Sequence, residues 1–174
     1  MKHLSLLLMG LFVASISLFP IDGFSMGSRV PAVGTTAEDF KLTDLAGKQQ
    51  SLSQYRGKVV LVNFWATSCV PCVAEMPKLV EAWRRYAPRG FETVAVAMNY
   101  DPPNAVAEFA QRHALPFRVA LDADGAVAAA FGHVSVTPTT YLLDRQGRIV
   151  TRYVGEPNWT DFRTRVERAL ADPA

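Results

Sequence analysis

One stretch of the sequence decides the fold: residues 59–72, VVLVNFWATSCVPC. Its first half, residues 59–65, is β-branched, apolar and short, which predicts a buried strand. Its second half contains the only two cysteines of the chain, Cys69 and Cys72. With two residues between them, both sulfurs lie on one face of a helical turn, close enough to form a reversible disulfide. A cysteine pair with this spacing, placed between the end of a strand and the start of a helix, is typical of proteins that catalyse thiol–disulfide exchange.

The two cysteines are expected to differ in reactivity. Cys69 lies at the expected helix start, where unsatisfied N–H groups and the positive end of the helix dipole favour a thiolate. Pro71 fits the first helical turn, because an N–H at that place would have no helical partner. Cys72 lies one turn further in and is shielded. We therefore expect Cys69 to be the nucleophile and Cys72 to be the thiol that resolves the mixed disulfide.

Other uses of the cysteine pair fit the sequence less well. A structural zinc site needs about four ligands, and the remaining candidates, His113 and His133, lie far along the chain and are expected to be ordinary surface or helix-cap residues. Covalent haem attachment needs a histidine directly after the second cysteine, where this chain has Val73. A static disulfide around so short a loop removes little chain entropy. The sequence therefore predicts a redox-active disulfide, with no metal and no other cofactor.

Further motifs accompany the cysteine pair: Glu75-Met76-Pro77, then residues 136–144 (VTPTTYLLD), then Gly147-Arg148-Ile149. Together with residues 60–72, these motifs resemble those of the TlpA/ResA-like periplasmic thiol–disulfide oxidoreductases, a group within the thioredoxin superfamily. The resemblance extends from about residue 33 to about residue 170, which is nearly all of the chain outside its N-terminal segment.

The resemblance implies that Glu75 takes part in catalysis. Thioredoxins proper have a buried aspartate where this chain has Asn63, and an amide cannot carry a proton. Glu75 lies three residues after Cys72 and so shares its helix face, where a half-buried carboxylate could hold the protons of the thiols during exchange. The alternative is a solvent-facing glutamate. The chain also departs from the family at Ser68, where a tryptophan is usual.

The same resemblance implies the substrate-binding residues. Pro138 is expected to be a cis-proline that faces the cysteines, which would expose the backbone of Thr137 for strand-like pairing with a substrate peptide. An ordinary proline at the start of a strand is the alternative. Trp65 is expected to pack beside the dithiol and to contribute to substrate binding, with pure core packing as its alternative.

The remaining sequence predicts an α/β fold. Strands are expected over residues 91–98, 117–122, 139–143 and 148–154, helices over residues 70–86, 101–113, 125–131 and 159–170, and a hairpin over residues 39–55. This order predicts a mixed central sheet with helices on both faces, and the resemblance implies a thioredoxin-like fold with an added N-terminal hairpin and a central strand–helix insertion. The side chains expected to face the core are Val73, Met76, Val80, Trp83 and Trp159.

Length and charge limit the architecture and the partners. The 174 residues, 49% of them hydrophobic, suffice for one domain, over residues 26–174. A formal charge of +2 is too small to indicate nucleic-acid binding. Met1-Lys2-His3 and the apolar residues 4–19 predict a secretory signal peptide or an N-terminal membrane anchor over residues 1–25. Either one places the domain in the periplasm or on the extracytoplasmic face of the inner membrane.

These features favour an extracytoplasmic protein-disulfide reductase. The resemblance implies apocytochrome c among its protein substrates, hence a role in cytochrome c maturation, and a membrane thiol protein as its electron donor. A disulfide-forming oxidase would use the same motif at a higher potential. A copper-binding chaperone is a further alternative, in which Cys69, Cys72 and a histidine would hold Cu(I).

Overall fold

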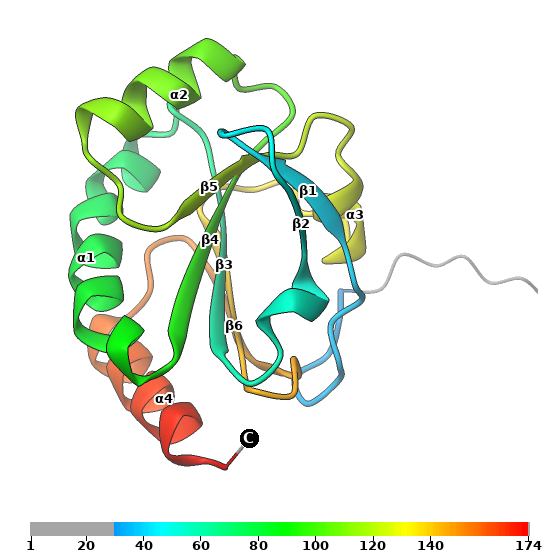
Figure 1. Ribbon diagram of the computed structural model, residues 1–174, viewed down its shortest axis with the longest axis vertical. Coiled ribbons are helices and arrows are strands. Elements are labelled where there is room, and N and C mark those ends of the chain that lie inside the picture. The colour runs from blue at the N-terminus through cyan, green and yellow to red at the C-terminus, as the bar shows by residue number, and fades with distance from the viewer. Residues whose placement is uncertain (1–29, 174) are drawn as a thin grey trace, which may run out of the picture.

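A seven-stranded mixed sheet forms the centre of the computed structural model, which describes residues 30–173 (Figure 1). The strands are β1 (Lys41–Asp44), β2 (Gln49–Ser51), β3 (Val59–Trp65), β4 (Phe91–Ala97), β5 (Arg118–Leu121), β6 (Thr139–Leu143) and β7 (Ile149–Val154). The helices are α1 (Val70–Tyr86), α2 (Pro103–Arg112), α3 (Ala126–Ala130) and α4 (Trp159–Ala171), with short 3₁₀ turns at Leu52–Tyr55 and Ala87–Arg89. Across the sheet the strand order is β2-β1-β5-β4-β3-β6-β7.

The pairing of the central strands decides where the cysteines lie. Strand β3 is parallel to β4 on one side and antiparallel to β6 on the other. The carboxyl ends of β3 and β4 therefore share one edge of the sheet with the amino end of β6. The cysteines follow β3 at this edge, and the proline motif precedes β6 at the same edge.

The mixed sheet with helices, expected from the sequence, is confirmed. The expected hairpin is the antiparallel pair β1–β2, and β1 also pairs with β5, so the hairpin extends the main sheet. The segment 1–25, expected to be a signal peptide or an anchor, lies outside the described residues. Among residues 30–173, none of the helices has the length and apolar character required to cross a membrane.

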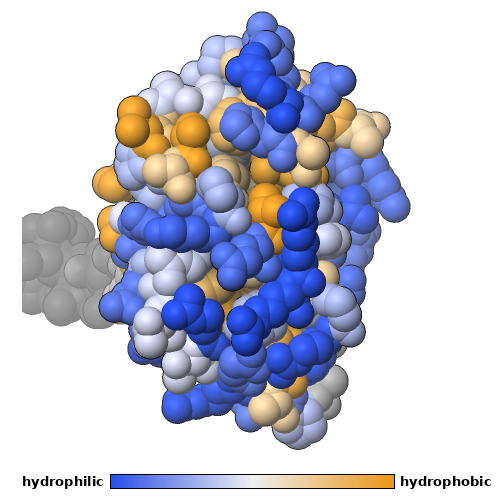
Figure 2. Space-filling model, turned by 90° about the vertical axis from the view of Figure 1, so that its left-hand side faces the viewer, coloured by the Kyte–Doolittle hydropathy of each residue, from blue (hydrophilic) through white to orange (hydrophobic). Residues whose placement is uncertain are grey.

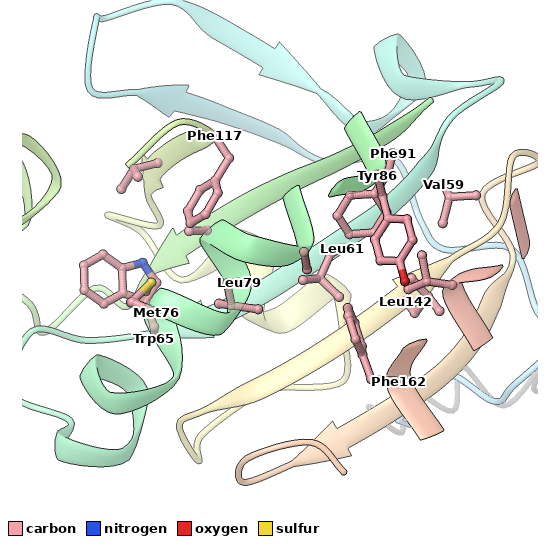
Figure 3. Packing of buried hydrophobic residues seen from close by; sticks show 14 of the residues in the cluster. Val59, Leu61, Trp65, Met76, Leu79, Tyr86, Phe91, Phe117, Leu142 and Phe162 are labelled. Carbon is pink, nitrogen blue, oxygen red and sulfur yellow. The ribbon is translucent and has the colours of Figure 1, made fainter. Parts of the chain in front are cut away.

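Two apolar cores lie on the two faces of the sheet. Helices α1, α2 and α4 contribute to the first core, while α3 and the β1–β2 hairpin contribute to the second. Every residue of β3 is buried, and its side chains alternate between the cores. Val59, Leu61 and Trp65 enter the first core (Figure 3), and Val60, Val62 and Phe64 enter the second.

The buried face of α1 differs from the expected one. Met76 is buried as expected, but Val73, Val80 and Trp83 are only partly buried. The indole N–H of Trp83 donates to Glu92 Oε1 at 2.9 Å, near the surface. The residues of α1 that are fully buried are Cys72, Glu75, Met76, Leu79, Ala82 and Tyr86. The helix is thus rotated toward a face that includes a carboxylate, which an apolar pattern does not reveal.

Trp159 was also expected in the core, and it is partly exposed. It is the first residue of α4, and its indole N–H donates to Glu156 Oε1 at 2.7 Å. Phe162, one turn later, takes the buried position instead. Figure 2 shows the side of the molecule on which α1 and α4 lie in Figure 1; hydrophilic side chains cover most of this surface and apolar ones appear as separate patches.

Replacement of Leu79 by alanine tests the packing of α1. Leu79 is fully buried in the first core, so Leu79→Ala is expected to lower the free energy of unfolding by about 2–5 kcal/mol. Urea denaturation of the oxidised protein measures this loss. Val70→Ala changes a side chain of the same helix that is 79% exposed, and it should alter the free energy by less than about 0.5 kcal/mol. Equal losses in the two variants would contradict this helix orientation.

Candidate functional site

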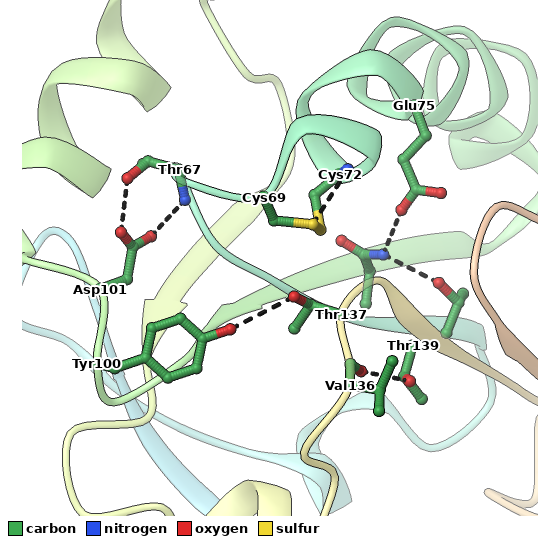
Figure 4. The surroundings of a disulfide bond; sticks show 11 residues. Thr67, Cys69, Cys72, Glu75, Tyr100, Asp101, Val136, Thr137 and Thr139 are labelled. Carbon is green, nitrogen blue, oxygen red and sulfur yellow. Dashed lines mark hydrogen bonds between the residues drawn. A yellow bond between two sulfur atoms is a disulfide. The ribbon is translucent and has the colours of Figure 1, made fainter.

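The cysteine pair lies at the start of α1 and forms a disulfide. Strand β3 ends at Trp65, three residues form a turn, and Cys69 is the N-cap residue of α1. Cys69 and Cys72 are joined by an S–S bond of 2.06 Å (Figure 4). The backbone N–H of Cys72 points at Cys69 Sγ across 3.3 Å. A free N–H of the first helical turn is thus directed at this sulfur, which favours negative charge on it once the disulfide is reduced.

The two sulfurs are unequally accessible. Cys69 is partly exposed, whereas Cys72 has no exposed surface. Val70, the residue that follows Cys69 in the chain, is 79% exposed. An incoming disulfide can therefore reach Cys69 but not Cys72, which agrees with the order of attack expected from the sequence.

Glu75 is buried beside the dithiol helix turn and has no exposed surface. Its Oε1 accepts a hydrogen bond of 2.9 Å from Asn63 Nδ2, and the same amide donates to Thr140 Oγ1 at 2.9 Å. Within residues 30–173, Glu75 Oε2 and Asn63 Oδ1 have no hydrogen-bond partner. The solvent-facing alternative for Glu75 is therefore wrong, because this carboxyl group points into the protein between α1 and the sheet.

Burial changes the acidity of this carboxyl group. Loss of hydration raises the pKa of Glu75 to about 7, although the hydrogen bond from Asn63 acts in the opposite direction. Glu156 raises the pKa of Glu75 further, and Lys78 lowers it. Both protonation states of Glu75 are therefore accessible near neutral pH, which is what a group that exchanges protons with thiols requires.

Two segments form the walls of the site: the turn between β3 and α1, which contains Cys69, and the loop before β6, which contains Thr137. The peptide bond between Thr137 and Pro138 is cis, as expected from the sequence. The hydroxyl of Thr139 donates to the carbonyl of Val136 at 2.7 Å and closes the loop. Within the described residues, neither the N–H nor the C=O of Thr137 has a backbone partner. The backbone of Thr137 is thus free to pair with another chain.

Trp65 does not contact the surface of the site. Its side chain has no exposed surface and packs on Phe109 of α2, with the ring centroids 5.1 Å apart. The expected substrate-binding role is therefore wrong for Trp65 in this structure, whereas the expected packing near the dithiol agrees with the first core, which contains both Trp65 and Cys72. The cause is strand alternation, which turns the last residue of β3 into the first core, under α2.

Two residues of the site, Tyr100 and Asp101, were missed by the sequence analysis. The helix expected over residues 101–113 begins at Pro103, after the N-cap residue Pro102, so Asp101 lies in the preceding loop. Asp101 accepts hydrogen bonds from Thr67, and the hydroxyl of Tyr100 lies 3.3 Å from Thr137 Oγ1. The only signal for them was their place after β4, at the edge of the sheet that holds the cysteines.

His113 and His133 are both exposed. In residues 30–173, no group of three or more histidine, cysteine, aspartate or glutamate side chains could hold a metal ion.

Comparisons with known proteins place the chain in a family. The Redoxin family model matches residues 32–170. The chain is similar to the thiol-disulfide oxidoreductase ResA of Geobacillus thermodenitrificans, with 36% identity over 157 residues, which are 90% of this chain and 89% of the relative. ResA of Geobacillus kaustophilus is 37% identical over 155 residues, covering 89% of this chain and 88% of the relative.

Solved structures share the fold. A putative thioredoxin of Neisseria meningitidis superimposes with a TM-score of 0.73 and 41% identity, covering 78% of this chain and 90% of that one. A putative thiol:disulfide interchange protein DsbE of Chlorobium tepidum gives a TM-score of 0.75 and 29% identity, covering 81% and 99% of the two chains. With its accessible Cys69, its buried Cys72 and these relatives, the chain belongs to the Redoxin family within the thioredoxin superfamily and is a ResA-like thiol:disulfide oxidoreductase.

Proposed function

We propose that this oxidoreductase is an extracytoplasmic protein-disulfide reductase whose active form is the Cys69/Cys72 dithiol. The observation that carries this proposal is the burial of Cys72 and Glu75 behind a partly exposed Cys69. This arrangement separates a thiol that meets the substrate from a thiol that completes the reaction inside the protein. The redox-active disulfide is the only cofactor that the proposal requires.

The reaction proceeds by two exchanges. The Cys69 thiolate attacks one sulfur of the substrate disulfide, that S–S bond breaks, and the leaving sulfur takes up a proton. Cys72 then loses its proton and attacks Cys69 Sγ, which breaks the mixed disulfide and releases the second substrate sulfur as a thiol. Two electrons pass to the substrate, and the protein keeps the Cys69–Cys72 disulfide observed in the structure.

Glu75 assists the second exchange, in which Cys72 attacks the mixed disulfide. Cys72 has no exposed surface, so its proton cannot pass directly to bulk water when it attacks. Glu75 lies on the same buried helix face, three residues later, and titrates near neutral pH. Asn63 holds one carboxylate oxygen through its amide. We assign to Glu75 the role of accepting the Cys72 proton, and to Asn63 the role of fixing the carboxylate.

The substrate docks on the surface around Cys69. Thr137 offers an N–H and a C=O without backbone partners in the described residues, which suits pairing with an extended segment of a substrate chain. Val70 and Val136 are 79% and 55% exposed, so uncharged apolar side chains are exposed both next to Cys69 in the chain and in the loop before β6. These features support a polypeptide substrate with apolar residues near its disulfide.

The location and the partners rest on the N-terminal sequence pattern and on the family resemblance. Residues 1–25 have the layout of a signal peptide or an anchor, which supports a periplasmic or membrane-attached domain. Apocytochrome c, other extracytoplasmic disulfide proteins and a membrane thiol protein as electron donor fit that location. Trapping of mixed disulfides on a Cys72→Ala variant, followed by identification of the bound proteins, tests these partners directly.

The first prediction concerns the two thiols. In the reduced protein near pH 7, limiting iodoacetamide should alkylate Cys69 at least about tenfold faster than Cys72, because Cys69 is the N-cap residue and is accessible. Mass spectrometry of the two labelled peptides gives both rates. Equal rates at Cys69 and Cys72 would remove the assignment of Cys69 as the nucleophile.

The second prediction concerns Glu75. Below about pH 7 its carboxyl is protonated and cannot accept the Cys72 proton, so the wild-type exchange rate with insulin should rise through this pH. Glu75→Gln should slow the exchange and lose that inflection, with an unchanged circular dichroism spectrum. Glu81→Gln, an exposed position on the same helix, is the matched control. A pH–rate profile shared by Glu75→Gln and the wild type would remove Glu75 from the mechanism.

Stability provides a second readout of the same group. A folded-state pKa above the unfolded value means that the folded protein binds more protons between these values. The free energy of unfolding of the oxidised protein should therefore fall as pH rises from about 4.5 to about 7, by up to about 3 kcal/mol. Glu75→Gln should lack this decrease.

The third prediction concerns the direction of electron transfer, that is, whether the protein reduces or oxidises its substrates. Val70 and Pro71 supply no cation that would stabilise a thiolate beyond the effect of the helix terminus, and an ionised Glu75 would disfavour a neighbouring thiolate. The reduced form is thus not specially stabilised, and the potential should lie near that of thioredoxin, about −270 mV. Equilibration with glutathione buffers measures it. A potential above about −180 mV, in the range of isomerases and oxidases, would show an oxidase instead.

A further inference from the structure

The loop after β4 contacts both walls of the dithiol site. Its residue Asp101 is only 4% exposed. Asp101 Oδ2 accepts a hydrogen bond of 2.6 Å from the N–H of Thr67, and Oδ1 accepts one of 2.5 Å from the Thr67 hydroxyl. The preceding residue, Tyr100, places its hydroxyl 3.3 Å from Thr137 Oγ1. Figure 4 shows the Asp101–Thr67 contact at the turn that leads to Cys69 and the Tyr100–Thr137 contact below it.

Asp101 acts on the turn that presents the nucleophile. Thr67 lies two residues before Cys69, inside a turn that is closed by a hydrogen bond of 3.1 Å from Cys69 N–H to the carbonyl of Ala66. Hydrogen bonds to an ionised acceptor are stronger and shorter than neutral ones. A two-point contact of this kind fixes both the backbone and the side chain of Thr67, and through them the direction in which the chain enters α1.

The burial of Asp101 is not explained by ion pairing. In the described residues no ion pair includes Asp101, and a buried carboxylate without a cation is unfavourable unless hydrogen bonds replace its hydration. Thr67 provides both of its side-chain contacts. The carboxylate therefore serves the turn rather than the packing of the core.

Tyr100 acts on the opposite wall. Thr137 precedes the cis-proline, and its backbone is the part of that loop available for pairing. The turn at Thr67 follows β3, and the loop at Thr137 precedes β6. Both segments lie beyond the paired part of the sheet, so the ladder between β3 and β6 does not fix their separation. The loop after β4 reaches both.

We propose that Asp101 and Tyr100 are positioning residues, which together hold Cys69 and the Thr137 backbone at the separation that a docked substrate disulfide requires. A substrate chain paired with Thr137 must place its sulfur in line with Cys69 Sγ, and small displacements of either wall lower the fraction of reactive complexes. The inference rests on the dithiol chemistry of the proposed function but not on its direction, since reduction and oxidation use the same geometry.

The two contacts are tested by variants that remove single hydrogen bonds. Thr67→Val removes the hydroxyl donor and keeps the size of the side chain, whereas Thr67→Ser keeps the hydroxyl and is its matched control. Asp101→Asn removes one of the two acceptors. Tyr100→Phe removes only the hydroxyl. Each full-length protein is assayed in the reduced state with 5,5′-dithiobis(2-nitrobenzoate), a small disulfide that needs no docking, and with insulin, a protein disulfide.

Different results are expected for the two walls. Thr67→Val and Asp101→Asn should shift the pH profile of Cys69 alkylation and slow exchange with both disulfides, by about tenfold, while Thr67→Ser stays near the wild-type rate. Tyr100→Phe should leave Cys69 alkylation and the small-disulfide rate unchanged and raise the KM for insulin several-fold, with a much smaller change in kcat.

Two results would overturn the proposal. If Thr67→Val and Asp101→Asn only lower the free energy of unfolding and leave the alkylation profile and both exchange rates unchanged, the contact is structural. If Tyr100→Phe leaves the KM for insulin unchanged, the loop does not position the Thr137 wall. Because alkylation of Cys69 requires no disulfide substrate and no electron donor, a wrong reductase assignment would leave this part of the test intact. If Asp101→Asn fails to fold, the comparison of Thr67→Val with Thr67→Ser still shows whether the Asp101–Thr67 contact affects the reactivity of Cys69.

Discussion

The whole site depends on the complete burial of strand β3 between two partner strands. All seven residues of β3 are buried, with β4 parallel on one side and β6 antiparallel on the other. A strand fixed along its whole length has a fixed end, and the turn to Cys69 starts from that end. The same strand also supplies Asn63, which faces α1 and holds the carboxylate of Glu75. The position of the thiols and the position of the acid are therefore set by one element.

The sequence predicted the elements that depend on local pattern. The apolar run of β3 and the bounds of α1 are as expected, because each follows from a local pattern, and the cis bond at Pro138 is as the family resemblance implied. The pairing of β1 with β5 could not be predicted in this way, since it joins segments about 80 residues apart without a common motif. The same holds for Asp101, whose partner Thr67 lies 34 residues away in the chain.

Errors in the predicted site have a shared physical cause. An analysis of apolar periodicity assigns every carboxylate to the surface. It therefore predicted a buried face of α1 with Val73, Val80 and Trp83, whereas the observed buried face includes Glu75. It also cannot tell whether an aromatic residue at a strand end points toward solvent or into a core, which is the case of Trp65. Both errors concern side chains whose neighbours are distant in sequence: Asn63 of β3 for Glu75, and Phe109 of α2 for Trp65.

The buried carboxyl group has a consequence for the energetics of electron transfer. Ionisation of Glu75 and reduction of the disulfide are two events at one buried helix turn, and any free energy by which one affects the other is reciprocal. If reduction changes the pKa of Glu75, then ionisation of Glu75 changes the midpoint potential by the equivalent amount. In that case the midpoint potential has a contribution from the ionisation state of Glu75, whose pKa is about 7, in addition to the pH dependence that the proton uptake of the dithiol itself produces.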